Sequence, residues 1–425
     1  MGIIKNWENL NKTPQRKVCL DLIESALSSI QPQNIVQKNF SLTNNILTIK
    51  DKTIDLSRFQ RIFLLGFGKG SAGLSKYIEN ILGNLLTEGC VIDLVPEQFS
   101  RIQFTMGTHP LPSENNLSFT KKSIERLGNL TEKDLVIVVI AGGGSALFES
   151  PYGIDLEKLI EVNKSLLLSG ATITEMNIVR KHLSMVKGGG LIKPLYPAVI
   201  VSVIASDVPG NELSAIASGP TVKDETTKED AIYVLRKFNL FDELKLSEDD
   251  FLETPKEDRY FENASNILLV SNQTALLAMR QKAKELAISA EIFSDKFQSD
   301  AKTAGRQLID KTLSGILLAG GETTVKILNK GGKGGRNQEL VLAALPYINS
   351  NITIASFDSD GWDNSPFSGA IADVKTLENA KNLGLDPNQY LAEDDSFSFF
   401  EKVGDGIDTG RLPSNVSDLM IVIRK

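Results

Sequence analysis

Cysteine, histidine and tryptophan are scarce in this chain of 425 residues, which contains only two of each. Cys19 and Cys90 lie in or beside apolar stretches, which excludes a disulfide framework and fits a reducing compartment. His109 and His182 are far apart in the sequence. Because isolated histidines are more often structural, a histidine-based metal site is not expected.

An excess of positive charge is also lacking. Lys and Arg number 46 against 53 Asp and Glu, for a net charge of −7, which argues against a nucleic-acid-binding surface. A local basic pocket for a small anion remains compatible with an acidic protein. No apolar run reaches transmembrane length, and residues 1–17 lack the apolar core of a secretory signal. We therefore expect a cytoplasmic protein that binds neither nucleic acid nor a membrane.

Apolar runs rich in β-branched residues recur along the chain, and several end in Gly, Ser or Asp. Such runs suit strands of a parallel sheet buried on both faces, and the intervals between them can hold crossover helices. This pattern predicts an α/β fold. The predicted strands are 61–70, 91–95, 135–145, 198–207, 267–272, 315–322 and 352–361.

The length of the chain predicts two domains, because one core rarely supports so many residues. The most polar stretch, about 223–263, is the candidate junction. We place one domain at 1–250 and the other at 262–425. Near the start, Thr13 and Pro14 predict the first turn of a helix.

Two glycine-rich loops follow predicted strands, where open α/β sheets bind ligands. In "GFGKGSAG" (66–73) the glycines would let backbone N–H groups approach an anion, and Lys69 could neutralise it. In "AGGGSALFESP" (141–151) three glycines and Ser145 repeat the arrangement. The alternatives are a solvated lysine on a tight turn and a serine that only caps a helix.

The first loop also resembles a dinucleotide-binding turn. Gly66, Gly68 and Ser71 nearly match G-x-G-x-x-G, and Asp93 follows at about the distance of a ribose-binding acid. An NAD(P)-dependent hydroxypyruvate reductase is therefore one alternative function. A non-catalytic binder of sugar phosphates is another.

Further candidates are basic or acidic. Arg180 and Lys187 are seven residues apart and would share a helical face, either toward an anion or toward solvent. "GGKGGRNQEL" (331–340) predicts either a flexible hairpin or an anion cradle that precedes a helix. Carboxylates follow three predicted strands. Phosphoryl transfer needs this mixture, with cations and N–H groups on phosphates and carboxylates for Mg²⁺.

The ordered motifs of residues 60–425 together resemble the type II glycerate kinases, the MOFRL-containing glycerate 2-kinase family. The motifs are "GFGKGSAG", "GTHPLPSENN", "AGGGSALFESP", "MNIVRKHLSMVKGGGL", "SDVPGNELSAIASGPT", "GGETTVKI", "GGKGGRNQEL" and "NVSDLMIVI". The resemblance implies a Rossmann-like N-terminal domain with a parallel sheet and a smaller α/β C-terminal domain of MOFRL type. The active site would lie in the cleft between them.

The resemblance also implies the reaction. The γ-phosphate of ATP would pass to the 2-hydroxyl of D-glycerate and give 2-phosphoglycerate, with Mg²⁺ or another divalent cation. The expected partners are D-glycerate and ATP, and a homodimer is compatible with the sequence.

Carried over by motif, the catalytic residues are Lys69, Arg336 and Asp207, and the metal ligands are Glu322 and Asp360. The expected substrate- and nucleotide-binding residues are Gly68, Ser71, Gly142, Gly143, Gly144, Ser145, Arg180, Lys187, Ser218, Gly219, Gly334, Gly335 and Asn337.

Two segments depart from the family pattern. "FDSDGWDNSP" (357–366) replaces a Gly-Pro-Thr by Asn364-Ser365-Pro366, and "DTGRLPSN" (408–415) has Arg411-Leu412-Pro413 in place of a small turn that contains threonine. Arg411 could supply a charged contact where the family has a hydroxyl.

Overall fold

The computed structural model describes residues 2–329 and 331–425, and its contacts divide the chain into two compact units. The N-terminal unit holds 35–206 and 211–269. The C-terminal unit holds 207–210 and the chain from Val270 onward, and residues 2–34 belong to it as well. The predicted domains, 1–250 and 262–425, follow chain order and do not contain this return of the first residues.

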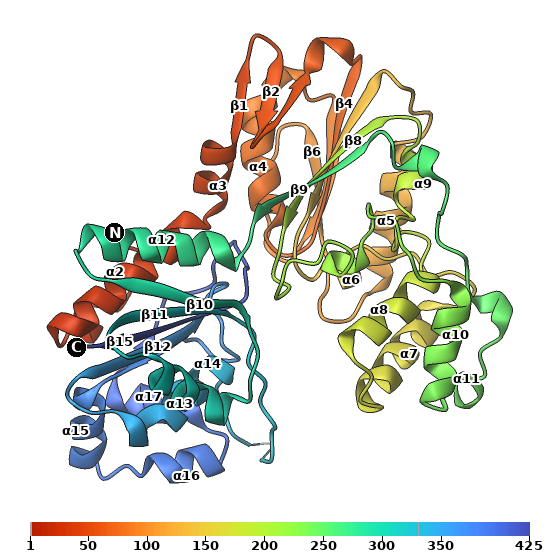
Figure 1. Cartoon of the computed structure of the whole chain (residues 1–425). Helices are drawn as coiled ribbons and strands as arrows, with labels where there is room; N and C mark the ends of the chain where they lie inside the picture. The colour runs from red at the N-terminus through yellow and green to blue at the C-terminus, as the bar shows by residue number, and fades with distance from the viewer. Residues whose placement is uncertain (1, 330) are drawn as a thin grey trace. The chain divides into compact units, whose positions relative to one another are not determined.

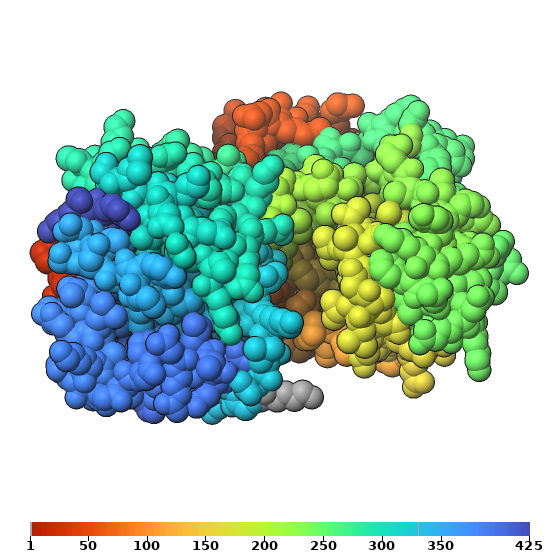
Figure 2. Space-filling view, turned by 60° about the horizontal axis from the view of Figure 1, so that its bottom comes forward, coloured from red at the N-terminus to blue at the C-terminus, as the bar shows by residue number. Residues whose placement is uncertain are grey.

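The packing of helix α2 explains why the first residues belong to the C-terminal unit. Thr13 accepts a hydrogen bond from the Arg16 N–H and starts α2 (Pro14–Ser29), as predicted. Helix α2 packs along α12 (Asn272–Glu285), and the two lie side by side in Figure 1. At the left edge of the space-filling view, a small red patch of the first residues lies among blue atoms of the C-terminal unit (Figure 2).

The N-terminal unit is built on a six-stranded sheet in the order β6-β5-β4-β7-β8-β9. Numbered within the sheet, this is the doubly wound order 3-2-1-4-5-6, and the pairs β6–β5, β5–β4, β4–β7 and β7–β8 are parallel. The predicted Rossmann-like fold is confirmed. The strands are β4 (Arg61–Phe67), β5 (Glu88–Asp93), β6 (Ile102–Met106), β7 (Asp134–Ile140), β8 (Val199–Ala205) and β9 (Ala264–Val270).

Strands β4 and β7 form the point at which the strand order reverses, so their carboxyl-end loops are the expected ligand site. The two glycine loops do lie together there. The Lys69 N–H donates to the Gly142 carbonyl at 2.7 Å. Gly68 has φ +109° and lies against the Ala141 carbonyl, so a side chain has neither the conformation nor the space it needs.

Helices surround this sheet and add a bundle beside it. Helix α4 packs against β4 and β5, and α7, α8, α10 and α11 share a separate apolar core. The helices of this unit are α3 (Pro32–Asn39), α4 (Ser71–Leu82), α5 (Glu114–Arg126), α6 (Gly144–Leu147), α7 (Leu156–Leu168), α8 (Ile173–His182), α9 (Ile192–Leu195), α10 (Lys228–Lys237) and α11 (Leu240–Glu243). A meander of β1 (Phe40–Thr43), β2 (Ile46–Ile49) and β3 (Lys52–Asp55) completes the unit.

The C-terminal unit has a mixed six-stranded sheet in the order β10-β11-β15-β12-β13-β14. The last strand, β15, runs antiparallel between β11 and β12, and the α/β class predicted for this half is confirmed. The strands are β10 (Ala290–Phe297), β11 (Gly315–Gly321), β12 (Ile352–Asp358), β13 (Gly369–Ala372), β14 (Gly406–Ile407) and β15 (Asp418–Arg424).

Helices cover both faces of this sheet (Figure 1). Helices α2 and α12 lie on one face, and α13, α14 and α17 enclose the core on the other. Besides α2 and α12, the helices of this unit are α1 (Trp7–Leu10), α13 (Ala301–Lys311), α14 (Arg336–Ala344), α15 (Val374–Asn382), α16 (Pro387–Ala392) and α17 (Ser396–Val403). Among the described residues, no helix combines the length and the apolar character needed to span a bilayer.

Candidate active site

A cavity of about 350 Å³ opens beside the second glycine loop of the N-terminal unit. We call it the basic pocket, because its charged side chains are Lys164, Arg180 and Lys187 against a single carboxylate, Glu149. Gly143 and Ser145 also line it, as do His109, Asn163 and several apolar side chains. The predicted residues Gly143, Ser145, Arg180 and Lys187 therefore meet in one cavity.

Arg180 projects from α8, and its Nε donates to the Asn163 Oδ1 at 2.7 Å. That partner is neutral, and among the described residues the Arg180 guanidinium has no ion-pair partner. Burial lowers the pKa of Arg180, and the charge of Glu149, which is paired with Lys187, opposes that shift. A half-buried cation of this kind favours an anionic ligand.

Lys187 differs from Arg180 in both burial and pairing. It is 1% exposed, and its ammonium forms an ion pair with Glu149. Burial lowers the pKa of Lys187, and the Glu149 carboxylate opposes that shift. Ser184 donates to the other oxygen of Glu149 at 2.5 Å. Lys187 therefore anchors the wall of the pocket.

The loops after β7 and β8 meet through hydroxyl groups. The Ser145 Oγ lies 2.9 Å from the Ser218 Oγ, which in turn donates to the Asn177 Oδ1 at 3.1 Å. Gly219 continues the turn with φ +63°. The predicted residues Ser145, Ser218 and Gly219 are thus connected, although of these three only Ser145 lines the basic pocket, and Ser218 is fully buried.

Lys69 lies at the other side of the second loop. A Cβ atom built on Gly143 would be 3.5 Å from the Lys69 Cε and 2.8 Å from the His109 Cδ2, so the three residues adjoin. Desolvation and the charge of Lys69 lower the pKa of His109 to about 4. The imidazole is therefore neutral at pH 7, when it can offer one donor and one acceptor.

The first glycine loop is arranged differently. The Ser71 hydroxyl is buried and donates to the Ile92 carbonyl at 3.2 Å. The Asp93 carboxylate accepts from the N–H groups of Gly70 and Ala72, both at 2.9 Å. An acidic side chain of the protein thus lies where the loop was expected to present N–H groups to a ligand.

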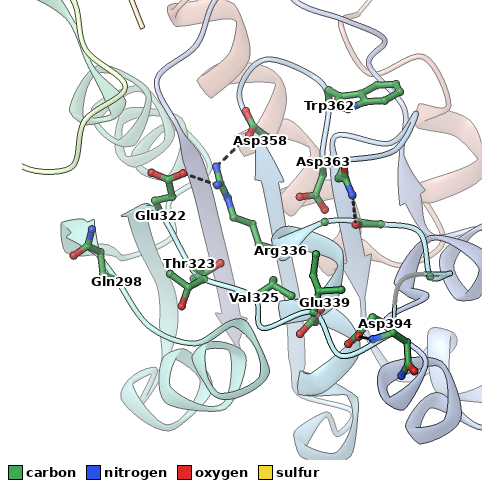
Figure 3. A pocket seen from close by; sticks show the side chains of 17 residues that line it. Gln298, Glu322, Thr323, Val325, Arg336, Glu339, Asp358, Trp362, Asp363 and Asp394 are labelled. Atoms are coloured by element: carbon green, nitrogen blue, oxygen red, sulfur yellow. Dashed lines mark hydrogen bonds and ion pairs between the residues drawn. The ribbon is translucent and has the colours of Figure 1, made fainter. Parts of the chain in front are cut away.

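A second, larger cavity of about 520 Å³ lies in the C-terminal unit (Figure 3). We call it the acidic pocket, because Arg336 is its one cationic side chain among the described residues. Its carboxylates are those of Glu322, Glu339, Asp358, Asp363 and Asp394. The predicted residues Gly334 and Gly335 line it as well.

Arg336 is the first residue of α14, and its side chain points toward Glu322 and Asp358 (Figure 3). Its Nη1 donates to the Glu322 Oε1 at 2.5 Å, after β11. Its Nε donates to the Asp418 Oδ2 at 2.6 Å, at the start of β15, and Nη2 lies 3.5 Å from the Asp358 Oδ2, at the end of β12. The antiparallel β15 brings these three strand ends to one edge.

The start of α14 is held by a second carboxylate contact. Asp363 accepts from the N–H groups of Asn337 and Gln338 at 3.1 and 2.8 Å, where a helix favours negative charge. Its carboxylate lies so close to Gly335 that a Cβ has no room there. Asn337 is fully buried and donates to Asp418 at 2.8 Å. Asn337 thus supports the cluster from within the protein.

Burial raises the pKa values of several carboxyl groups in and around this pocket. The pKa of Asp418 rises to about 6, where Arg336 opposes the effect of burial, and that of Asp358 rises through burial and its neighbours Asp360 and Asp418. Burial also raises the pKa of Glu339 to about 7, against the opposing charge of Lys302. Among the described residues, two cations face these carboxylates, Arg336 and Lys302, which lies 3.3 Å from Asp394 and 3.8 Å from Glu339. They are fewer than the carboxylates, so the pocket favours additional positive charge.

Asp207 and Asp360, two of the acids predicted from motifs, also lie in the C-terminal unit. Asp207 belongs to the C-terminal unit, where the Asn415 amide lies 3.5 Å from its carboxylate. The Asp360 N–H donates to Asp358, and its Oδ1 accepts from the Trp362 N–H at 2.9 Å. Within residues 2–329 and 331–425, no group of three or more His, Cys, Asp or Glu side chains is arranged to hold a metal ion.

Known proteins resemble this chain over nearly its whole length. Residues 18–253 match the domain of unknown function DUF4147, and residues 315–418 match the MOFRL family. A glycerate 2-kinase of Pyrococcus horikoshii is 34% identical over 96% of this chain and 97% of its own length. The crystal structure of a Thermotoga maritima glycerate kinase has a TM-score of 0.85 and 31% identity, over 96% of this chain and 99% of that one.

The chain belongs to the glycerate kinase family with DUF4147 and MOFRL domains. A protein of Agrobacterium vitis that is 34% identical over 85% of this chain and 87% of its own length carries the provisional name hydroxypyruvate reductase. The glycerate kinase names extend over more of this chain and include a solved structure. They are therefore the stronger evidence for the family of this chain.

Relative to the family pattern, the two departing segments contact each other in the structure. The Arg411 guanidinium stacks 4.0 Å from the centre of the Trp362 ring, and the Leu412 N–H donates to the Asp360 carbonyl at 2.8 Å. Trp362 lines the acidic pocket. The two segments therefore contact each other at Trp362, and the first of them contributes to the lining of this pocket.

Reasoning from the sequence missed several residues. Asp418 lies in the motif "NVSDLMIVI", and its position at the start of a buried strand was the available signal. Glu339 and Asn163 lie inside ordinary helical patterns, α14 and α7, and carry no local signal. Only the packing of distant elements places them at a pocket.

Proposed function

We propose that this protein transfers the γ-phosphate of ATP to the 2-hydroxyl of D-glycerate and yields 2-phosphoglycerate. The observation that carries the proposal is the pair of oppositely charged pockets in a chain that belongs to the glycerate kinase family. One pocket suits a small free anion, and the other suits a nucleotide that arrives with a divalent cation.

We assign D-glycerate to the basic pocket. Its carboxylate would pair with Arg180, which has no ion-pair partner among the described residues. Ser145, which lines the pocket and is bonded to the buried Ser218, would bond a hydroxyl group of the substrate. Lys187 would hold the pocket wall, and the backbone of Gly142, Gly143, Gly144 and Gly219 would shape it. Lys69, beside Gly143, would stabilise charge on the phosphoryl group as it is transferred.

We assign the nucleotide to the acidic pocket, which has the larger volume. A triphosphate would be repelled by five carboxylates unless a divalent cation accompanied it. The donor set fits Mg²⁺, because all of its donors are carboxylate oxygens and because Mg²⁺ often binds through one or two carboxylates plus phosphates. Glu322 and Asp360 would hold the ion, and when bound it would neutralise phosphate charge.

Arg336 would then contact the transferred phosphoryl group, while Gly334, Gly335 and Asn337 fix its direction. Asp207 would orient the attacking hydroxyl as the acceptor of its proton. That the two domains share one active site stays a prediction from sequence, as do a cytoplasmic location and a homodimer.

The test is an assay of the product. Purified protein, ATP, Mg²⁺ and D-glycerate should give ADP and one phosphomonoester, which phosphorus NMR assigns to carbon 2. L-Glycerate in place of D-glycerate should give much less. Formation of 3-phosphoglycerate would correct the position of transfer, and ADP formation that does not depend on glycerate would sink the proposal.

The alternative reductase would consume NADH with hydroxypyruvate. We expect no such oxidation, because Asp93 blocks the N–H groups of the loop on which the reductase hypothesis relies. The same assay series therefore separates the two functions.

A further inference from the structure

Asp93 ends β5, next to the strand that carries the first glycine loop, and it is 1% exposed. Its Oδ2 accepts from the Gly70 and Ala72 N–H groups at 2.9 Å each, and its Oδ1 accepts from the Leu94 N–H at 2.6 Å. Burial raises the pKa of Asp93 to about 6, although these hydrogen bonds oppose the rise. At neutral pH the side chain is an ionised carboxylate with three N–H donors.

Two of those donors are the ones that an anion at the start of α4 would require. Gly70 is the N-cap of this 12-residue helix, and Ala72 is in its first turn. The N–H of Ser71, between them, donates to the Gly68 carbonyl at 3.1 Å. The start of α4 is thus already supplied with negative charge from β5, and a ligand phosphate would have to displace a buried carboxylate.

Asp93 also fixes the backbone around Lys69. On one side, the Lys69 N–H donates to the Gly142 carbonyl at 2.7 Å, which ties the first glycine loop to the second. On the other side, Gly70 is held by Asp93. The chain that carries the Lys69 side chain is therefore clamped on both sides, with its Cε beside Gly143.

We propose that Asp93 is a positioning residue that serves as a built-in anion at the start of α4, fixes Lys69 for phosphoryl transfer, and keeps phosphate groups away from this loop. The role of Lys69 in this statement rests on the proposed kinase function. The exclusion of phosphate does not. If phosphate is excluded from this loop, Gly68 and Ser71, which were expected to bind substrate or nucleotide, would instead shape the loop and make no contact with the nucleotide.

The inference is tested with Asp93→Ala and Asp93→Asn beside a matched control, Asp134→Ala. Asp134 is also 1% exposed and lies in the same sheet, at the opposite end of β7, where it pairs with Arg61. Loss of either carboxylate should lower thermal stability. Only loss of Asp93 should disturb Lys69, so stability and turnover are measured together.

For Asp93→Ala we expect kcat to fall about 10- to 100-fold, because a small displacement of a catalytic group is costly, while KM for ATP and for D-glycerate changes less than about threefold. Formate, which can replace the missing carboxylate, should restore part of the rate. Asp93→Asn should be intermediate, because its amide oxygen still accepts one hydrogen bond, and it carries the test if the alanine variant does not fold. Equal losses of kcat in Asp93→Ala and Asp134→Ala would overturn the positioning role.

A second measurement needs no kinase activity. Inorganic phosphate should raise the Tm of Asp93→Ala more than that of the unmodified protein, because the start of α4 becomes free to bind an anion. Equal phosphate-induced shifts in the two proteins would overturn the built-in anion. If the unmodified protein forms no glycerate-dependent ADP, the proposed function fails, and this arm still decides the role of Asp93.

Discussion

The two pockets differ most in how each holds its arginine. Arg180 in the basic pocket is bonded to a neutral amide, so its charge remains available to a ligand. Arg336 in the acidic pocket is bonded to three carboxylates, so its charge is already compensated. The same residue type thus has no ion-pair partner among the described residues in one unit and organises a carboxylate cluster in the other.

This difference predicts separate kinetic roles. Changes in the basic pocket should act mainly on the affinity for glycerate. Changes in the acidic pocket should act mainly on turnover and on the need for a divalent cation.

Removal of divalent cations should have the largest effect. With excess EDTA we expect nearly complete loss of ADP formation, because the nucleotide cannot approach five carboxylates without a counter-ion. Mg²⁺ should restore the rate, and Glu322→Gln should raise the Mg²⁺ concentration needed for half-maximal activity. Full activity in EDTA would remove the reason for placing the nucleotide in the acidic pocket.

Arg336→Lys should lower kcat on the order of 10²–10³-fold and leave KM for D-glycerate nearly unchanged. Lysine keeps the charge but cannot pair with Glu322, Asp358 and Asp418 at once. Because Asp418 is 0% exposed, the Tm should fall as well. Turnover is therefore corrected for the folded fraction, and a loss of kcat explained by unfolding alone would contradict a catalytic role.

Arg180→Ala should raise KM for D-glycerate about 10- to 100-fold, since a hydrogen bond to a charged group contributes about 1.5–3 kcal/mol. The Tm should change little, because no ion pair is broken. Arg236→Ala is the matched control, since Arg236 lies on α10, is exposed and pairs with Glu248. If both variants behave alike, the carboxylate of glycerate binds elsewhere.

Glu339→Gln should stabilise the protein at pH 8. Glu339 has its folded pKa raised to about 7, so its contribution to stability is present at low pH and is lost as the pH rises from about 4.5 to about 7. At pH 8 the ionised, buried carboxylate costs about 3 kcal/mol. Urea unfolding at pH 4 and pH 8 measures this, with the exposed Glu401→Gln on α17 as control. Equal stability of Glu339→Gln and the unmodified protein at pH 8 would contradict the raised pKa.

Arg411→Ala should have the smallest effect. Its stacking on Trp362 is partly exposed and contributes about 0.5–1 kcal/mol. Because Trp362 lines the acidic pocket, we expect a KM for ATP changed about two- to fivefold and an unchanged KM for D-glycerate. A change in the affinity for D-glycerate alone would contradict the assignment of this pocket to the nucleotide.

The sequence predicted much of this architecture. The strands β4, β5, β7, β8, β9, β11 and β12 were predicted because strands buried on both faces are continuous apolar runs, whereas β6 and β10 were not predicted. Glycine-rich strand ends marked the loops at β4 and β7. It did not reveal that β15 inserts antiparallel between β11 and β12, because the partner of a strand depends on distant contacts.

The candidate site was predictable only where chemistry follows a strand end or a recognisable motif. Lys69, Arg336 and Glu322 carried such signals. The orientation of the Asp93 side chain carried no such signal. The spacing that suggests a ribose-binding acid is the same whether the carboxylate faces a ligand or the start of α4. Only hydrogen bonds in the folded chain distinguish the two.

The most direct test of the division between the pockets is titration calorimetry with D-glycerate in the absence of nucleotide. The account predicts that Arg336→Lys binds D-glycerate with the affinity of the unmodified protein, whereas Arg180→Ala loses most of that affinity. Loss of glycerate binding in Arg336→Lys, with binding retained in Arg180→Ala, would contradict it.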